Sequence, residues 1–234
     1  MSLIDAKGLT KTYKTGDVEV RAVREIDFEI EPASFVSFVG PSGSGKSTVL
    51  NMIGCLDRPT GGDLMVMDTD VYKLNRKQAA AFRGGNIGFI FQEFNLIPIL
   101  TVFENVEYPL LMVQDWPSGK RRERTFEMLK EVGMSDMMDK RPSQLSGGQK
   151  QRVAVARALV ANPHLVLADE PTANLDSETA YKIINLMKEM RDKYETTFIF
   201  STHDPKIMGE AEVMFVLEDG QIRERKEKGD AQNV

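Results

Sequence analysis

The segment GPSGSGKST, residues 40–48, decides the fold of this 234-residue chain. Gly40, Gly45, Lys46 and Ser47 occupy the defining places of the phosphate loop G-x-x-x-x-G-K-[ST]. Its glycines let consecutive backbone N–H groups point at a polyanion, while the lysine reaches the β- and γ-phosphates and the serine hydroxyl coordinates Mg²⁺. A buried-strand pattern precedes the loop and a helical pattern follows it. This context predicts a nucleotide-binding α/β domain and disfavours a loop that merely turns the chain.

Strand and helix patterns continue outward from the loop and bracket a helical insert. Alternating apolar and polar residues at 3–14 and 18–31 predict antiparallel strands. Residues from about 101 to 160 have helical periodicity, after which strand patterns resume and end in a hairpin around Asp219 and Gly220. We expect a mixed-sheet phosphate-loop core with an N-terminal antiparallel β subdomain and an inserted α-helical subdomain.

Composition and charge fit a folded protein and disfavour some functions. Hydrophobic residues make up 41% and charged residues 28% of the chain, as in ordinary globular domains. A net charge of −5 argues against wrapping nucleic acid by bulk electrostatics. The single cysteine, Cys55, suits a reducing compartment, and we expect a small buried side chain on a helix. Without a visible signal peptide or an apolar run of ~20 residues, a cytoplasmic protein is expected, or one held at a membrane by another.

Polar side chains follow several of the predicted strands. LVLADEP places Asp169 and Glu170 at the carboxyl end of a buried strand, where open α/β sheets bind ligands. Asp169 suits a second Mg²⁺ contact, and Glu170 can orient or deprotonate an attacking water. Gln92 follows IGFIF and can coordinate Mg²⁺ or orient water, and His203 follows FIFST and can donate to a γ-phosphate oxygen. A lone histidine is more often a surface or capping residue, which is how we interpret His164.

A second glycine-rich segment, LSGGQKQR at 145–152, precedes another predicted helix. It presents a hydroxyl and two glycines at a helix start, as a phosphate-binding device does. One nucleotide needs only one phosphate loop, so the segment is left over within a single chain.

These motifs and their order resemble those of ATP-binding cassette (ABC) proteins over about residues 3–224. The residues on which this resemblance rests are the phosphate loop, Gln92, LSGGQ (145–149), LVLADE (165–170), ANLD (173–176) and His203. The resemblance implies that Mg-ATP is hydrolysed by a two-fold dimer, in which each LSGGQ segment faces the ATP held by the other copy. It implies a single ABC domain spanning 1–234, with 1–92 and 162–225 as the core and 93–161 as the helical signature subdomain.

The resemblance also implies a role for each matching residue. Tyr13 would stack on adenine, and ATP would be bound by Tyr13, Gly40, Ser42, Gly43, Gly45, Lys46, Ser47 and Thr48. Metal would be held at Ser47, Gln92 and Asp169, and catalysis would rest on Glu170, His203, Gln92 and Lys46. The signature contacts in trans would come from Ser146, Gly147, Gly148 and Gln149, and Asp176 would lie in a loop that crosses between subunits.

Segments 51–62 and 91–111 resemble one branch of the family: the ATPases of lipoprotein-releasing and macrolide-exporting systems and their cell-division relative. That branch implies ATP-driven homodimerisation and a separate integral membrane permease, an FtsX-like subunit with four spans. It places the ATPase at the cytoplasmic face of the inner (plasma) membrane. The apolar stretch 94–113 can present a groove to this partner or pack the core of the helical subdomain. Two departures, EPAS at 31–34 and Asn174 in ANLD, remove no catalytic group.

Two other classes compete with this interpretation. A soluble ABC ATPase acting on nucleic acid or ribosomes usually carries two cassettes or a long coiled coil, whereas this chain has one cassette, no long heptad run and an acidic balance. No nucleic-acid partner is therefore expected. A small-molecule kinase or GTPase would have no use for LSGGQ, and the guanine-reading motif Asn-Lys-x-Asp is absent from the sequence.

Overall fold

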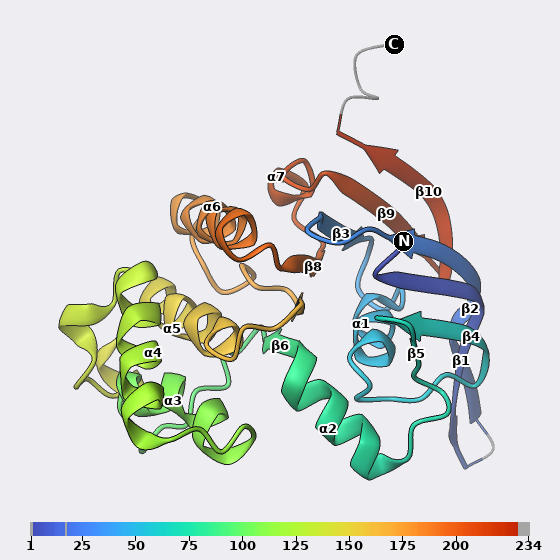
Figure 1. Cartoon of the computed structure of the whole chain (residues 1–234). Coiled ribbons are helices and arrows are strands. Elements are labelled where there is room, and N and C mark those ends of the chain that lie inside the picture. The colour runs from blue at the N-terminus through green and yellow to red at the C-terminus, as the bar shows by residue number, and fades with distance from the viewer. Residues whose placement is uncertain (1, 17, 229–234) are drawn as a thin grey trace. The chain divides into compact units, whose positions relative to one another are not determined.

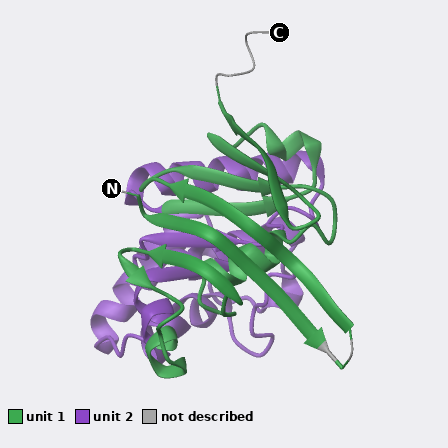
Figure 2. Cartoon of the chain, turned by 90° about the vertical axis from the view of Figure 1, so that its right-hand side faces the viewer, with its two compact units in different colours: residues 1–80, 197–234 green, residues 81–196 purple. Residues whose placement is uncertain are grey.

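The computed structural model describes residues 2–16 and 18–228 (Figure 1). The chain divides into two compact units, residues 1–80 with 197–234 and residues 81–196 (Figure 2). Residues 1, 17 and 229–234 of the predicted domain lie outside the described residues. The predicted subdomain boundaries near 92 and 161 stay a prediction. Among the residues described, no helix is long and apolar enough to cross a membrane.

The first unit contains the predicted antiparallel sheet. Its strand order is β2-β1-β4-β5, with β1 (Ile4–Thr15), β2 (Val18–Ile30), β4 (Gly61–Val66) and β5 (Thr69–Asp70). Shifts in the register of β1 against β2 occur between Ala6 and Thr12. Such bulges increase the local twist of a strand and change which side chains share one face.

A second set of strands in this unit holds the phosphate loop. β3 (Phe35–Val39) runs parallel to both β8 (Thr197–Thr202) and β9 (Val213–Glu218), and β10 (Gln221–Glu227) pairs antiparallel with β9. Every residue of β3 and β8 is buried, as expected for strands covered on both faces. Phe28, Phe38 and Phe215 pack together with ring centroids 5.2–5.8 Å apart.

Two helices of this unit come after strands whose carboxyl ends are followed by predicted site residues. α1 (Lys46–Ile53) follows the loop after β3, and the short α7 (Pro205–Met208) follows β8. Cys55 was expected to be buried on a helix, but it is half-buried and lies just beyond α1 with φ 53°. The reason is that α1 ends at Ile53 with Gly54 as its C-cap, and left-handed backbone is common immediately after a helix.

The second unit combines one pair of parallel strands with helices. β6 (Ile87–Ile90) pairs with β7 (Leu165–Ala168), and Gly88 of β6 approaches α5 so closely that a Cβ would lie 2.3 Å from the Ala158 carbonyl oxygen. Only glycine permits this approach. The helical elements are α3 (Val102–Met112), α4 (Ser118–Glu131), α5 (Gly147–Leu159), α6 (Ser177–Tyr194) and the 3₁₀ turns η1 (Ser135–Met137) and η2 (Pro142–Gln144).

Helix α2 (Arg76–Asn86), which carries the chain from one unit to the other, was not predicted. None of its residues is buried, and its apolar residues form one short run at 79–82, so the segment lacks the long apolar repeat of a helix that faces a core. Gly84 and Gly85 near its end are also weak helix formers.

Candidate functional site

The phosphate loop in the first unit has the backbone that its glycines predict. Gly43 and Gly45 have φ values of 81° and 106°, in the left-handed region that favours glycine. A Cβ on Gly45 would lie 2.5 Å from the Ala22 carbonyl oxygen, and one on Gly40 would lie 2.0 Å from that of Leu217. Both glycines therefore allow the loop to lie directly against neighbouring backbone.

Helix α1 begins at Lys46, immediately after the loop, and has no acidic residue in its first turn. The first N–H groups of a helix have no intrahelical acceptors and carry partial positive charge, which attracts anions. The Lys46 ammonium is nearly buried, and its Nζ donates to the carbonyl oxygens of Gly40 at 2.8 Å and Pro41 at 2.9 Å. Loop, lysine and helix start thus form a concentrated positive site suited to a polyphosphate.

His203 lies at the same edge of the sheet as this loop. Val39 and Thr202 are the last paired residues of the parallel strands β3 and β8, so Gly40 and His203 both follow directly at the carboxyl edge. His203 is exposed and immediately precedes Asp204, whose carboxylate caps α7. His203 follows a strand end, as its sequence context indicates, and its role stays a prediction.

Tyr13, also in the first unit, is held by polar contacts that no sequence motif indicated. Its hydroxyl donates to Asp57 Oδ2 at 2.7 Å, and the Lys11 ammonium lies 4.8 Å from the centre of its ring. The largest effect on Tyr13 is burial, which together with the Asp57 carboxylate raises its pKa above the ordinary value of 10.0. The phenol therefore stays protonated at neutral pH and acts as a donor.

In the second unit, the predicted acids and Gln92 lie at one edge of the parallel pair. Ile90 pairs with Ala168, and the Asp169 N–H donates to the Ile90 carbonyl oxygen at 2.9 Å. Gln92 and Glu170 therefore follow neighbouring strand ends. The side-chain amide of Asn174 donates to the Gln92 carbonyl oxygen at 3.0 Å, which ties the segment after β7 to the segment after β6.

Glu170 has a left-handed backbone, with φ 50°. This conformation is uncommon for a residue with a side chain and costs free energy, and such strain gathers at functional positions. The turn is closed by the Ala173 N–H, which donates to the Glu170 carbonyl oxygen at 3.2 Å. The carboxylate is thus carried on a constrained turn at the strand end and not on a continuing strand.

The segment beyond Gln92 is anchored by Arg157 of α5. Phe94 and Asn95 both have positive φ, at 62° and 46°, and their carbonyl oxygens accept from the Arg157 guanidinium at 2.8 and 2.5 Å. Burial lowers the pKa of Arg157 from its ordinary value, although a guanidinium remains charged in proteins. Helix α5 therefore holds the loop that carries Gln92.

The LSGGQ segment begins α5 with a reciprocal cap. The Gln149 N–H donates to Ser146 Oγ at 3.3 Å, and the Ser146 N–H donates to Gln149 Oε1 at 2.9 Å. A Cβ on Gly148 would lie 2.5 Å from Thr179 Cγ2, and one on Gly147 would lie 3.2 Å from Leu175 Cδ2. The glycines were interpreted as bare N–H donors, but in this unit they also make room for the start of α6.

Asp176 caps the following helix. Its carboxylate accepts from the Thr179 N–H at 3.0 Å, and hydrogen bonds from Thr179 lower the pKa of Asp176 below its ordinary value of 3.8. Thr179 thus contacts both the ANLD cap and the signature glycine. Within the second unit, the structure brings LSGGQ and ANLD together.

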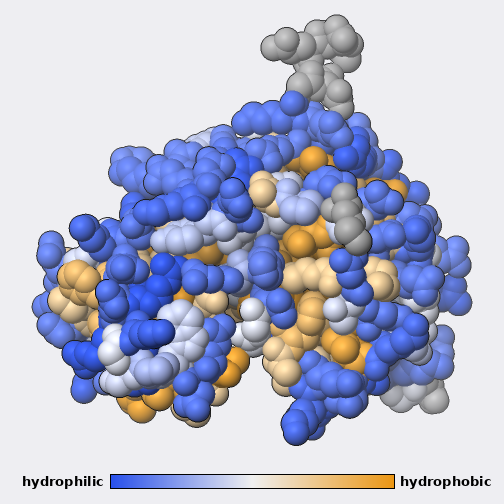
Figure 3. Space-filling view, in the orientation of Figure 1, coloured by the Kyte–Doolittle hydropathy of each residue, from blue (hydrophilic) through white to orange (hydrophobic). Residues whose placement is uncertain are grey.

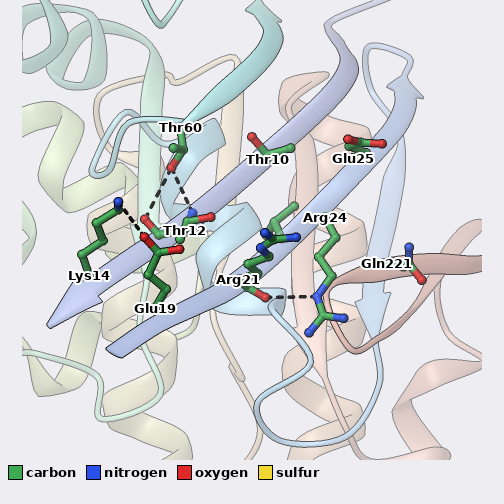
Figure 4. A pocket seen from close by; sticks show the side chains of 10 residues that line it. Thr10, Thr12, Lys14, Glu19, Arg21, Arg24, Glu25, Thr60 and Gln221 are labelled. Carbon is green, nitrogen blue, oxygen red and sulfur yellow. Dashed lines mark hydrogen bonds and ion pairs between the residues drawn. The ribbon is translucent and has the colours of Figure 1, made fainter. Parts of the chain in front are cut away.

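The four-stranded sheet of the first unit carries a polar pocket that no predicted site residue lines (Figure 4). It encloses about 560 Å³ and is lined by Thr10, Thr12, Lys14, Glu19, Arg21, Val23, Arg24, Glu25, Thr60 and Gln221. None of the predicted ATP-binding residues lines it. Lys14 and Glu19 form an ion pair at 2.6 Å, so part of its charge is already neutralised.

Together, a buried strand, a glycine phosphate loop and a helix start define a phosphate-loop nucleotide-binding protein, and the capped LSGGQ segment narrows the class to an ATP-binding cassette. The sequence model of the ABC transporter family matches residues 23–173. The ABC transporter ATP-binding protein MJ0796 of Methanocaldococcus jannaschii is 45% identical over 229 residues, which cover 97% of each chain. The chain belongs to the ABC transporter family, as predicted.

Two relatives with named systems and one solved structure are also similar. The lipoprotein-releasing ATP-binding protein LolD of Legionella pneumophila is 40% identical across 95% of this chain and 98% of that protein. The macrolide export protein MacB of Syntrophobacter fumaroxidans is 43% identical across 95% of this chain but only 31% of its own length. A dimeric post-hydrolysis structure of MJ0796 with ADP and Pi has a TM-score of 0.88 at 42% identity, covering 96% of this chain and 98% of that one. The predictions of the ABC ATPase fold and of an ATP-hydrolysing enzyme are confirmed.

Proposed function

We propose that this chain is the ATP-hydrolysing subunit of an ABC transporter or mechanotransmission complex of the lipoprotein-releasing and macrolide-exporting branch. The observation that carries the proposal is the phosphate loop, whose glycines lie against backbone and whose lysine and helix start concentrate positive charge. The ATP-binding residues are Tyr13, Gly40, Ser42, Gly43, Gly45, Lys46, Ser47 and Thr48.

The proposed reaction is in-line attack of water on the γ-phosphorus of ATP. Glu170 accepts the proton of the water as the new O–P bond forms, the bond to the β-phosphate oxygen breaks, and ADP and phosphate are released. Lys46 stabilises charge on the phosphate oxygens, and His203 donates to a γ-phosphate oxygen. The constrained backbone at Glu170 supports this role because it fixes where the carboxylate leaves the strand end.

Magnesium would be held by Ser47, Gln92 and Asp169. These side chains supply a hydroxyl, an amide and a carboxylate oxygen, which suit a hard cation that keeps several waters and is shared with phosphates. Among the described residues, no group of three or more histidine, cysteine or acidic side chains is placed to hold a metal ion. When bound, the ion neutralises charge on the β- and γ-phosphates.

We further propose a homodimer that closes on ATP. Ser146, Gly147, Gly148 and Gln149 of one copy would contact the phosphates held by the other, and Asp176 would lie in the loop between the subunits. Support comes from the cap geometry, which fixes Ser146 at the exposed start of α5. The solved structure of the relative MJ0796 bound to ADP and Pi is dimeric, which is consistent with such closure.

The proposed membrane partner would dock on α3 of the second unit. This helix buries Val102, Val106 and Leu110, which pack the unit's own core, and exposes Leu111 at 44% and Met112 at 61%, which supports the proposed docking. Figure 3 shows hydrophobic side chains along the lower edge of this unit, where Figure 1 places α3. A four-span FtsX-like permease, with this chain at the cytoplasmic face of the inner membrane, is the partner we propose.

Purification of the tagged chain from native membranes, followed by mass spectrometry, tests the partner. A membrane protein with four apolar spans should copurify, and Met112→Asp should lose it because a charge would enter the apolar contact. Tyr72→Asp is a matched control, since Tyr72 is exposed at 51% on the other unit. Recovery of ribosomal or nucleic-acid-bound proteins alone would contradict this proposal and support the soluble ABC class.

A further inference from the structure

The Tyr13 side chain contacts two residues, Lys11 and Asp57, that are not among the predicted site residues. Its hydroxyl donates to Asp57 Oδ2 at 2.7 Å, and Asp57 Oδ1 accepts from Lys11 Nζ at 2.5 Å. The same ammonium donates to the Arg58 carbonyl oxygen at 2.7 Å. Lys11 is only 9% exposed, whereas Tyr13 is 38% exposed. A buried cation and a carboxylate thus restrain a ring that is itself partly open to solvent.

Lys11 also restrains the ring through one of its faces. The ammonium lies over the Tyr13 ring, 4.8 Å from its centroid, which is within the range of a cation–π contact. A planar base can stack only on a ring face that nothing else covers. The face away from Lys11 is therefore the one available to adenine.

Asp57 is tied to the helix that follows the phosphate loop. The N–H groups of Leu56 and Asp57 donate to the Asn51 carbonyl oxygen of α1, at 2.8 and 3.1 Å. α1 begins at Lys46, so one short segment runs from the phosphate-binding lysine to the carboxylate that holds Tyr13. The ring is thereby linked, through Asp57, to the helix that begins directly after the phosphate loop.

We propose that Asp57 and Lys11 are positioning residues for the nucleobase, holding the Tyr13 ring so that the face away from Lys11 meets the adenine of ATP. This inference rests on the proposed function, in which Tyr13 stacks on adenine. Neither residue touches the reacting phosphate, so they set affinity for the base and not the rate of the chemical step.

The Asp57 carboxylate stays charged, so its restraint on the Tyr13 ring is present throughout the neutral pH range. Burial raises the pKa of Asp57, but hydrogen bonds from Lys11 and Tyr13 and the Arg58 N–H outweigh it, so the pKa lies below its ordinary value. The carboxylate therefore remains ionised at neutral pH. Its hydrogen bonds with these three donors involve a charged acceptor and are therefore stronger than neutral hydrogen bonds.

Binding of ADP and of inorganic pyrophosphate to the whole chain separates base affinity from phosphate affinity. Tyr13→Ala should raise the Kd for ADP about tenfold through lost stacking. Asp57→Ala and Tyr13→Phe should each raise it about threefold to tenfold, because the ring keeps its area but loses its restraint. The Kd for pyrophosphate should stay within about twofold in every variant.

Three further measurements sharpen the test. The double variant Tyr13→Phe/Asp57→Ala should bind ADP no more weakly than Asp57→Ala alone, since Asp57→Ala already removes the hydrogen bond that Tyr13→Phe removes. Asp57→Ala should raise KM for ATP with kcat unchanged. Asp70→Ala is the matched control, because Asp70 forms an ion pair with Lys73 at 2.8 Å in the same unit but lies outside the cluster, and it should leave both ligands unaffected.

The outcomes distinguish this inference from the proposed function. If Tyr13→Ala leaves ADP binding unchanged, the stacking role of Tyr13 is wrong. If Tyr13→Ala weakens ADP binding but Asp57→Ala and Tyr13→Phe do not, only the positioning role is overturned. If Asp57→Ala weakens ADP and pyrophosphate equally, Asp57 supports the loop as a whole and the inference also fails. Asp57→Asn, which keeps the side-chain size, repeats the test should the alanine variant not fold.

Discussion

Asp169 donates its backbone N–H to the carbonyl oxygen of Ile90 at 2.9 Å, one residue beyond the last strand pair, Ile90 and Ala168. The parallel pairing of β6 with β7 therefore continues to the point where both strands end. Gln92 and Glu170 follow at neighbouring strand ends for this reason. Gln92 and Asp169 share one edge of the strand pair because parallel strands end together, although the two residues are 77 positions apart in the sequence.

Replacing the proposed base should separate binding from hydrolysis. We expect Glu170→Gln to bind ATP as the parent does but to lower turnover by about 10²-fold or more, because the water loses its proton acceptor. Phosphate release and nucleotide titration measure the two effects. Turnover within about tenfold of the parent would exclude Glu170 as the main base.

A bulky charge at Ser146 should block closure of the dimer. We expect Ser146→Arg in the Glu170→Gln background to stay monomeric in size-exclusion chromatography with saturating Mg-ATP, while nucleotide affinity of the monomer is nearly unchanged. Ser146→Thr is the control, because threonine keeps the oxygen that caps α5. Lost nucleotide binding by the monomer would mean that Ser146 contacts the ATP of its own chain.

A methyl group at Gly148 should destabilise the second unit through one identified contact. The new Cβ would lie 2.5 Å from Thr179 Cγ2, and such overpacking costs about 1–3 kcal/mol. Gly148→Ala should therefore lower the unfolding free energy, and adding Thr179→Ser should restore it, since serine lacks that methyl group. Urea denaturation measures both, with Thr179→Ser alone as the reference. A double variant as unstable as Gly148→Ala would locate the strain elsewhere.

Lysine in place of Arg157 should loosen the segment that carries Gln92. A lysine cannot place two donors on the carbonyl oxygens of Phe94 and Asn95 at once. We expect Arg157→Lys to lower the unfolding free energy by about 1–3 kcal/mol, with faster hydrogen exchange around residues 92–97. Unchanged exchange there would show that the arginine does not anchor this loop.

The cap of α6 should give a pH-dependent contribution to stability. The pKa of Asp176 is lower in the folded protein than its ordinary 3.8, so ionisation favours folding. The stability that ionised Asp176 contributes is fully present above the pKa of Asp176 in the unfolded chain. It is lost as the pH falls through the lower pKa of Asp176 in the folded protein. Between about pH 5 and pH 3, wild type should therefore lose more thermal stability than Asp176→Asn, whose amide oxygen caps without titrating. Parallel declines would contradict this.

Most of the fold could be predicted because its elements have strong local patterns. The strand before the phosphate loop is an almost continuous apolar run, and the long helix α6, residues 177–194, has buried apolar residues repeated along one face. The Asp219–Gly220 hairpin also has its expected place between β9 and β10. These features depend on residues near one another in sequence.

The contacts that could not be predicted join residues far apart in the chain. Lys11 and Asp57 meet across 46 residues, and nothing in an alternating strand indicates which lysine is buried. Arg157 reaches the carbonyl oxygens of Phe94 and Asn95 across more than sixty residues. Backbone acceptors leave no signature in a sequence, so such anchors become visible only in the folded chain.

The reciprocal cap between Ser146 and Gln149 has an evolutionary consequence. These side chains start α5 in the chain's own fold, and the same residues are proposed to close over a second copy's ATP. A substitution here is selected against once for folding and again for assembly. Drift in this short segment would therefore be slower than either constraint alone would cause, and a lineage could relax it only by rebuilding a helix start and a subunit contact together.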